Sequence, residues 1–199
     1  EADERLTASG EVLMPLAEEH ALSIVEAVRA SGAAAGAVCF LHSYADPRHE
    51  AALGELLRAL LPGVYVSLSH EIVREYREYE RTSTTVMNAY IGPETSQYVG
   101  RMDERLRGDD FAGRFLIMQS NGGVMSPATA KKLPVAMMES GPVGGVIASA
   151  RVGEALGFRN LIAFDMGGTT AKTSLIKDNE VSVAQGYHIG GYASGHPVM

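Results

Sequence analysis

Two apolar, β-type runs joined by a short polar turn constrain the fold of this chain more than any other feature. The runs cover residues 161–164 and 173–176, and the turn starts at Asp165 and continues Gly167-Gly168-Thr169-Thr170. Such runs suit buried strands, and paired glycines let the backbone adopt positive φ and approach a ligand closely. Successive N–H groups in the turn can bind one anion, with threonine hydroxyls beside them. The pattern predicts a phosphate-binding β-hairpin, with a plain tight hairpin as the alternative.

Other phosphate-binding loops do not fit this string. A Walker A loop would need glycines where the chain has Met166 and Ala171. A GxGxxG dinucleotide motif should open a helix, whereas a second β-type run follows here. Asp165 is expected at the end of the first strand, and a carboxylate does not bind phosphate directly. Its predicted partner is therefore Mg²⁺, held through water, or a water molecule in line for attack.

Composition restricts the partners of the chain. The net charge of -7 and the pI of about 5.4 argue against nucleic acid or an anionic membrane as the main partner. Cys39 is the one cysteine, so no internal disulfide can form, and a reducing cytosol fits best. No apolar run approaches the roughly 18 to 20 residues that span a bilayer.

Hydrophobic periodicity predicts alternating helices and strands. Helices are expected at 15–31, 47–61, 81–107 with an interruption at Gly92-Pro93, 127–132 and 142–156; strands are expected at 37–42, 64–68, 115–119, 161–165, 172–177 and 181–187. The early strand-helix-strand order argues for parallel pairing covered by helices. The last three strands suggest an antiparallel meander.

The turn from Asp165 to Thr170 (DMGGTT) resembles the second phosphate motif of the hydantoinase A/5-oxoprolinase family, within the actin, sugar-kinase and heat-shock-chaperone ATPase superfamily. Three other segments resemble family segments in the same order: 80–90 (ERTSTTVMNAY), 118–123 (MQSNGG) and 139–145 (ESGPVGG). The chain is identified as a member of that family on these motifs.

The resemblance implies an α/β fold of the ribonuclease-H-like (actin-like ATPase) type, present in part. Residues 1–91 would form the end of a first domain, and residues 92–199 linking helices and the start of a second. Family members carry an earlier Asp-x-Gly-Gly-Thr motif and a later Gly-rich segment, and this sequence has neither. We therefore expect an internal fragment of a longer protein, inactive and weakly ATP-binding by itself.

The activity implied by the resemblance is ATP-dependent hydrolysis of a cyclic amide, such as a hydantoin or 5-oxoproline, by a cytoplasmic enzyme. Phosphorylation of the ring carbonyl oxygen would activate the adjacent carbon for attack by water. The alternatives are an ATP-dependent ketone carboxylase subunit, a sugar- or acetate-kinase-like phosphotransferase, and a nonenzymatic nucleotide-binding module. A second, hydantoinase B-type subunit and an oligomeric full-length form are also implied.

The expected site combines the turn with two further Gly-rich loops. Residues 120–123 follow an expected strand, at an edge where α/β sheets bind ligands, and residues 140–142 precede a helix whose free N–H groups can hold an anion. An ordinary turn and an ordinary capped helix are the alternatives. Asp165 is the candidate catalytic and Mg²⁺-binding residue. The candidate ATP-binding residues are Gly167, Gly168, Thr169, Thr170, Lys172, Asn121, Gly122, Gly123, Ser140 and Gly141.

Two local features need a physical reason. Gly144-Gly145 near the start of a helix is costly for helix propensity, which suggests a close approach of backbone or ligand. The family string ends Thr-Ser-Thr-Asp, whereas this chain has Ala171 and Lys172 in the last two places. Lys172 could contact a phosphate or a carboxylated substrate as a point charge, or point outward. This departure leaves the choice between hydrolysis and carboxylation open.

Overall fold

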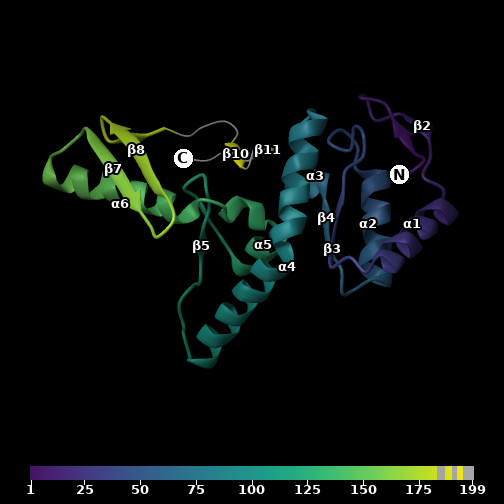
Figure 1. The fold of residues 1–199 in the computed structure, drawn as a ribbon, viewed down its shortest axis with the longest axis horizontal. Coiled ribbons are helices and arrows are strands. Elements are labelled where there is room, and N and C mark those ends of the chain that lie inside the picture. The colour runs from purple at the N-terminus through teal and green to yellow at the C-terminus, as the bar shows by residue number, and fades with distance from the viewer. Residues whose placement is uncertain (183–186, 190–191, 195–199) are drawn as a thin grey trace.

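The long helix α4 (Glu78–Gly108) joins two α/β lobes that lie at opposite ends of the molecule (Figure 1). The structure, a computed structural model, describes residues 1–182, 187–189 and 192–194. We call residues 1–72 the N-terminal lobe and residues 140–182 the C-terminal lobe. Nowhere in the described ranges is a helix both long enough and apolar enough to cross a membrane.

The N-terminal lobe is built on two parallel strands. β3 (Ala35–Val38) pairs with β4 (Tyr65–Leu68), with Ala35 opposite Tyr65. α1 (Glu18–Ser31) and α2 (Arg48–Leu60) lie on one side of this pair and α4 on the other (Figure 1). The core between the helices and strands consists of Ala21, Val25, Val38, Leu53, Leu57, Leu61 and Leu68. The predicted parallel pairing covered by helices is confirmed.

Short elements complete this lobe. β1 (Arg5–Leu6) and β2 (Val12–Met14) form an antiparallel pair, and α3 (Ser69–Ile72) follows β4 directly. α1 ends, as predicted, before Gly32, which adopts the left-handed conformation at φ 65°. Glycine has no Cβ and therefore accepts this helix-ending conformation without strain.

The interruption predicted at Gly92-Pro93 is wrong, because α4 runs through Pro93 for 31 residues. Proline removes one helical hydrogen bond and usually costs about 3 kcal/mol inside a helix. Packing accompanies this continuity, since Thr85, Asn88, Ala89 and Gly92 are buried on one face of the helix. Tertiary packing thus outweighs the tendency of Pro93 to interrupt the helix. Residue 91 lies inside this helix, and the division into domains at that point stays a prediction.

The middle of the chain packs on the second half of α4. β5 (Ile117–Met118) and β6 (Val124–Met125) form a short antiparallel pair, followed by α5 (Pro127–Lys132) and a 3₁₀ turn, Pro134–Met137. Val99, Met125, Ala130 and Ala136 form the core here. α5 has the predicted bounds, whereas the strand predicted at 115–119 is reduced to residues 117–118.

The C-terminal lobe packs one helix on an antiparallel sheet. α6 (Ser140–Leu156) covers the sheet β7 (Leu161–Met166), β8 (Ala171–Lys177), β9 (Glu180–Val181), which has the order β7-β8-β9. Val146, Ala150, Ala163 and Ile176 form its core. The predicted meander is confirmed as far as Val181.

The end of the chain is described only in part. β10 (Tyr187–Ile189) pairs with β11 (Tyr192–Ser194), and β11 contacts α4. Residues 183–186 of the strand predicted at 181–187 lie outside the described residues. The α/β class is confirmed, and the ribonuclease-H-like assignment remains a prediction.

Candidate functional site

The hairpin predicted from the sequence is present, with its glycines and threonines in an exposed turn. Asp165 lies opposite Lys172 in the register, and Met166 opposite Ala171 ends the pairing. The turn is closed by the Gly167 N–H, which donates to the Thr170 carbonyl at 3.0 Å. Asp165 is therefore one residue before the end of its strand. All residues from Gly167 to Thr170 are exposed and accessible to a ligand.

One face of this hairpin and the start of α6 enclose a pocket of about 300 Å³. Side chains alternate between the two faces of a strand, so Asp165 and Lys172 project to the same face as the buried Ala163 and Ile176. The pocket is lined by Gly141, Pro142, Gly145, Val146, Ser149, Ala163, Phe164, Asp165, Lys172 and Ser174. Three predicted site residues, Asp165, Lys172 and Gly141, are thus brought together from β7, β8 and α6.

Glycines of α6 keep this pocket open. A Cβ added at Gly141 or Gly145 would meet no atom within 4 Å, whereas one at Gly144 would lie 3.9 Å from Cε of Met118. Gly141 and Gly145 are four residues apart, and therefore lie on the same helix face. The glycines that weaken the helix locally thus create space beside Asp165 and Lys172.

The start of α6 differs slightly from the prediction. Ser140 is the first helical residue, Pro142 is the third, and the N-cap position is taken by Glu139. No side chain caps this end, so N–H groups of the first turn and the positive end of the helix dipole remain for an anion. Ser140 is beside the pocket but does not line it.

Lys172 does not point away from the lobe. Its Nζ forms an ion pair with Oε2 of Glu139, the residue that precedes α6. The two side chains are 35% and 26% exposed, so the pair is partly shielded from water. The ammonium therefore joins the hairpin to the start of the helix.

Asn121, Gly122 and Gly123 form the turn between β5 and β6. Asn121 Oδ1 accepts a hydrogen bond from the Gly123 N–H at 2.9 Å, and Gly122 has φ 83°. The expected ligand-binding edge of a parallel sheet is not found here, since β5 pairs antiparallel with β6. These residues do not line the pocket at Asp165. Their polar groups make hydrogen bonds within the turn itself. An ATP-binding role for these residues stays a prediction.

Magnesium would have to rely on a single protein carboxylate. Across the residues described, no group of three or more His, Cys, Asp or Glu side chains could hold a metal ion. Asp165 is the acidic residue among those lining the pocket. Mg²⁺ commonly uses one or two carboxylates together with substrate phosphates and water, and this donor set therefore fits it.

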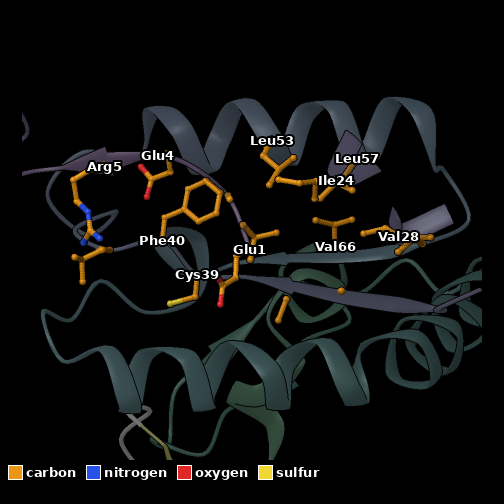
Figure 2. Close-up of a pocket in the computed structure, with 16 residues that line it drawn as sticks. Glu1, Glu4, Arg5, Ile24, Val28, Cys39, Phe40, Leu53, Leu57 and Val66 are labelled. Atoms are coloured by element: carbon orange, nitrogen blue, oxygen red, sulfur yellow. The ribbon is translucent and has the colours of Figure 1, made fainter. Parts of the chain in front are cut away.

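A larger cavity lies in the N-terminal lobe (Figure 2). It has a volume of about 490 Å³ and is lined mainly by apolar side chains of α1, α2, β3 and β4. Glu1, Glu4, Arg5 and Cys39 lie toward one end. None of the predicted phosphate-binding residues lines it, so the smaller pocket is the better candidate for nucleotide chemistry.

Sequence reasoning missed Glu139 and Ser149 as parts of the site, whereas the close approach that it suggested at Gly144-Gly145 is found at Gly145, which lines the pocket. Gly141, Gly145 and Ser149 follow one another at four-residue intervals, which is the signal that could have placed them on one helix face. No comparable pattern identifies Glu139, because its partner Lys172 is distant in sequence.

Sequence reasoning also missed a buried polar cluster where β3 and β4 end. The Glu50 carboxylate is 1% exposed and accepts hydrogen bonds from the N–H groups of Phe40 and His70, both at 2.8 Å. It also accepts from Ser69 Oγ and pairs with His70 Nδ1 at 2.8 Å. These bonds tie α2 to the segments that follow both strands.

Comparison with known proteins places the whole chain in one group. The family models described as Hydantoinase/oxoprolinase and Hydantoinase/oxoprolinase N-terminal region match residues 81–199 and 1–61. An uncharacterised protein of Methanocaldococcus jannaschii is 41% identical over 100% of this chain and 30% of its own length. Caprolactamase subunit alpha of Pseudomonas jessenii is 31% identical over 98% of this chain and 28% of its own.

Two solved structures share the fold. The nucleotide-free structure of acetone carboxylase matches with a TM-score of 0.89 and 26% identity, over 99% of this chain and 28% of that one. The structure of the ATP-dependent caprolactamase from Pseudomonas jessenii matches with a TM-score of 0.83 and 31% identity over the same shares. The chain therefore spans less than a third of the length of these relatives.

Proposed function

Because this chain belongs to the hydantoinase/oxoprolinase family, we propose that the whole protein is an enzyme that uses ATP to hydrolyse a cyclic amide. The observation that carries the proposal is the pocket in which Asp165, Lys172 and the glycine-lined start of α6 meet beside the Gly-Gly-Thr-Thr turn. This arrangement offers backbone N–H groups, hydroxyls and one carboxylate on a single side of the lobe. Such groups suit a nucleotide phosphate and its cation.

The roles follow from the position of each group. The backbone and hydroxyls of residues 167–170 hold phosphate oxygens, with Gly141 and Ser140 contributing from the helix end. Asp165 orients the attacking water or the cation. Mg²⁺, when bound, neutralises charge that develops on the phosphoryl oxygens. Holding the ring carbonyl oxygen in line with the γ-phosphorus is the main requirement of such a transfer.

The chemistry balances in three steps that consume one ATP and two waters. The ring carbonyl oxygen takes the γ-phosphoryl group from ATP, and ADP leaves. Water then adds to the activated carbon, and the ring C–N bond breaks to leave an open-chain acyl phosphate and a free nitrogen. A second water hydrolyses this acyl phosphate to inorganic phosphate and the open-chain acid. A neutral amide is a poor electrophile, and phosphorylation of its oxygen makes the same carbon more reactive toward water.

In the whole protein, residues 1–91 and 92–199 belong to two domains that close on the nucleotide in a cytoplasmic enzyme. A second subunit of hydantoinase B type is expected, since caprolactamase and acetophenone carboxylase relatives are both named as subunits.

Ketone carboxylation is the second candidate, because the acetophenone carboxylase gamma subunit of Aromatoleum aromaticum is 32% identical over 89% of this chain and 25% of its own length.

The test is the substrate dependence of ADP release. The whole protein, with any subunit that copurifies, is assayed with 5-oxoproline, hydantoin, caprolactam, and acetone plus bicarbonate. We expect ADP release only with a cyclic amide, in equal amount with the ring-opened product. In Asp165→Asn, this release should fall by about a hundredfold or more, as for loss of a group acting in the transition state. Equal ATP turnover without substrate, or a stable phosphorylated product, would contradict the proposal.

A further inference from the structure

We propose that Glu139 is the counter-ion that holds Lys172 away from Asp165, so that the Asp165 carboxylate stays available for a divalent cation. This inference rests on the proposed role of Asp165 in binding the cation of a nucleotide. It makes Glu139 and Lys172 positioning residues, and it explains how the pocket accepts a lysine beside its carboxylate.

The register of the hairpin places a lysine beside the carboxylate of the pocket. Asp165 and Lys172 are directly opposite each other in β7 and β8. Side chains at opposite positions of antiparallel strands share one face, with their Cβ atoms about 4.5–5.5 Å apart. A lysine at that distance is an intramolecular competitor for any cation that approaches the carboxylate.

The competing pair between Lys172 and Asp165 is not formed. Lys172 Nζ contacts Glu139 Oε2 instead, and in the part of the chain described here Asp165 takes part in no ion pair. Glu139 cancels the lysine charge, which leaves the pocket with one uncompensated negative charge at Asp165. A divalent cation that bridges to phosphate oxygens suits such a charge balance.

The backbone of Glu139 adopts an uncommon conformation. This residue has φ 70° at the N-cap of α6, a left-handed conformation that non-glycine residues adopt uncommonly. Its carboxylate makes no capping bond to its own helix. The Glu139 side chain instead pairs with Lys172 of the hairpin. Its backbone lies at the start of α6, the helix that forms the other wall of the pocket.

Direct contact between Lys172 and phosphate predicts the opposite response to substitution. If Lys172 binds phosphate, removing its charge weakens binding of the metal–nucleotide complex whatever stands at residue 139. If Glu139 sequesters Lys172, removing the Glu139 charge frees the lysine to pair with Asp165, and removing the lysine as well restores the site.

The experiment measures Mn²⁺ binding to the whole protein at saturating ADP, from the electron paramagnetic resonance signal of free Mn²⁺. We expect Glu139→Gln to weaken Mn²⁺ binding by about tenfold, since the freed Lys172 ammonium then pairs with the Asp165 carboxylate and neutralises it. The double variant Glu139→Gln with Lys172→Met should bind within about twofold of the wild type, and Lys172→Met alone should bind no more weakly. Glu139→Gln with Lys172→Arg keeps the positive charge and should resemble Glu139→Gln. Thermal unfolding verifies that each variant is folded.

The outcomes separate this inference from the proposed function. Unchanged binding in Glu139→Gln, or equally weak binding in Lys172→Met and the double variant, would overturn the inference while Asp165→Asn still loses Mn²⁺. If Asp165→Asn binds Mn²⁺ as the wild type does, the proposed role of Asp165 fails instead.

Discussion

Gly92 of α4 lies directly against the aromatic ring of Tyr65 from β4. A Cβ placed at Gly92 would be 2.2 Å from Cε1 of that ring, and the Tyr65 hydroxyl donates a hydrogen bond to the Lys131 carbonyl at 2.7 Å. The Tyr65 ring is thus held by its contact with Gly92 and by the hydrogen bond of its hydroxyl to Lys131. This contact joins the N-terminal lobe to α4 next to Pro93, and helps explain why the helix continues through the proline.

Gly92→Ala is expected to destabilise the protein although alanine favours helix. The methyl group would overlap an anchored ring, and overpacking of this kind costs about 1–3 kcal/mol in the free energy of unfolding. Urea denaturation of the 199-residue chain measures the change. The matched control is Gly145→Ala, also inside a helix, where a Cβ meets open space. The control should gain about 0.5–1 kcal/mol. A gain of similar size at both glycines would refute the importance of the Tyr65 contact.

Gly145→Ala is also expected to impair ligand binding while it stabilises the fold. Its methyl group enters the pocket beside Asp165, so affinity of the whole protein for MgADP should fall several-fold, by about 1 kcal/mol. Isothermal titration calorimetry gives the affinity. Gly144→Ala is the control, because that position faces Met118 and does not line the pocket. Equal effects of the two alanines on affinity would argue against this pocket as the nucleotide site.

The hairpin could be predicted from sequence because its signals are local. The two apolar, β-type runs at 161–164 and 173–176 and the turn chemistry of Gly167-Gly168 depend only on neighbours in the chain. The continuity of α4 could not be predicted in this way, since it depends on Tyr65, a residue far from Pro93 in sequence. The Glu139–Lys172 ion pair could not be predicted either, because its two residues are far apart in sequence. Site residues on one element were accessible to pattern reasoning, and the pairs that join elements were not.

Glu50→Ala should be strongly destabilising. The buried carboxylate accepts hydrogen bonds from Phe40, Ser69 and His70, and its removal leaves these donors without their acceptor in the interior. Leaving a buried hydrogen-bond donor unsatisfied costs about 1–3 kcal/mol for each donor, so we expect a loss of about 3 kcal/mol or more. Glu55→Ala, on an exposed position of the same helix, is the control and should change the free energy of unfolding by less than about 0.5 kcal/mol. Chemical denaturation of both variants tests this, and a loss below about 1 kcal/mol for Glu50→Ala would contradict it.

Tyr65 should make stability fall at alkaline pH. Burial raises the pKa of the Tyr65 hydroxyl, so the neutral phenol is favoured more in the folded than in the unfolded chain. The resulting stabilisation is complete below the ordinary tyrosine pKa of about 10 and is lost as the pH rises through the folded-state pKa. Tyr65→Phe should lose about 1 kcal/mol at pH 8 with its hydrogen bond, yet show a flatter decline above pH 10. Parallel slopes for the two proteins in urea titrations from pH 8 to 11 would contradict this linkage.

The outer face of the β7–β8 hairpin should make the 199-residue chain associate with itself when it is isolated. Ile162, Phe164, Met166 and Leu175 are 73%, 62%, 71% and 67% exposed, and they share the face opposite to Asp165 and Lys172. An apolar patch on an edge strand favours association, because both its side chains and its free backbone groups can pair with another copy. Replacing Ile162 and Phe164 with threonine keeps β-propensity and should reduce association in sedimentation velocity experiments, with the circular dichroism spectrum unchanged. Leu13→Thr, at an exposed position of β2, is the control; if it lowers association as much as the hairpin substitutions do, the hairpin face is not the surface responsible.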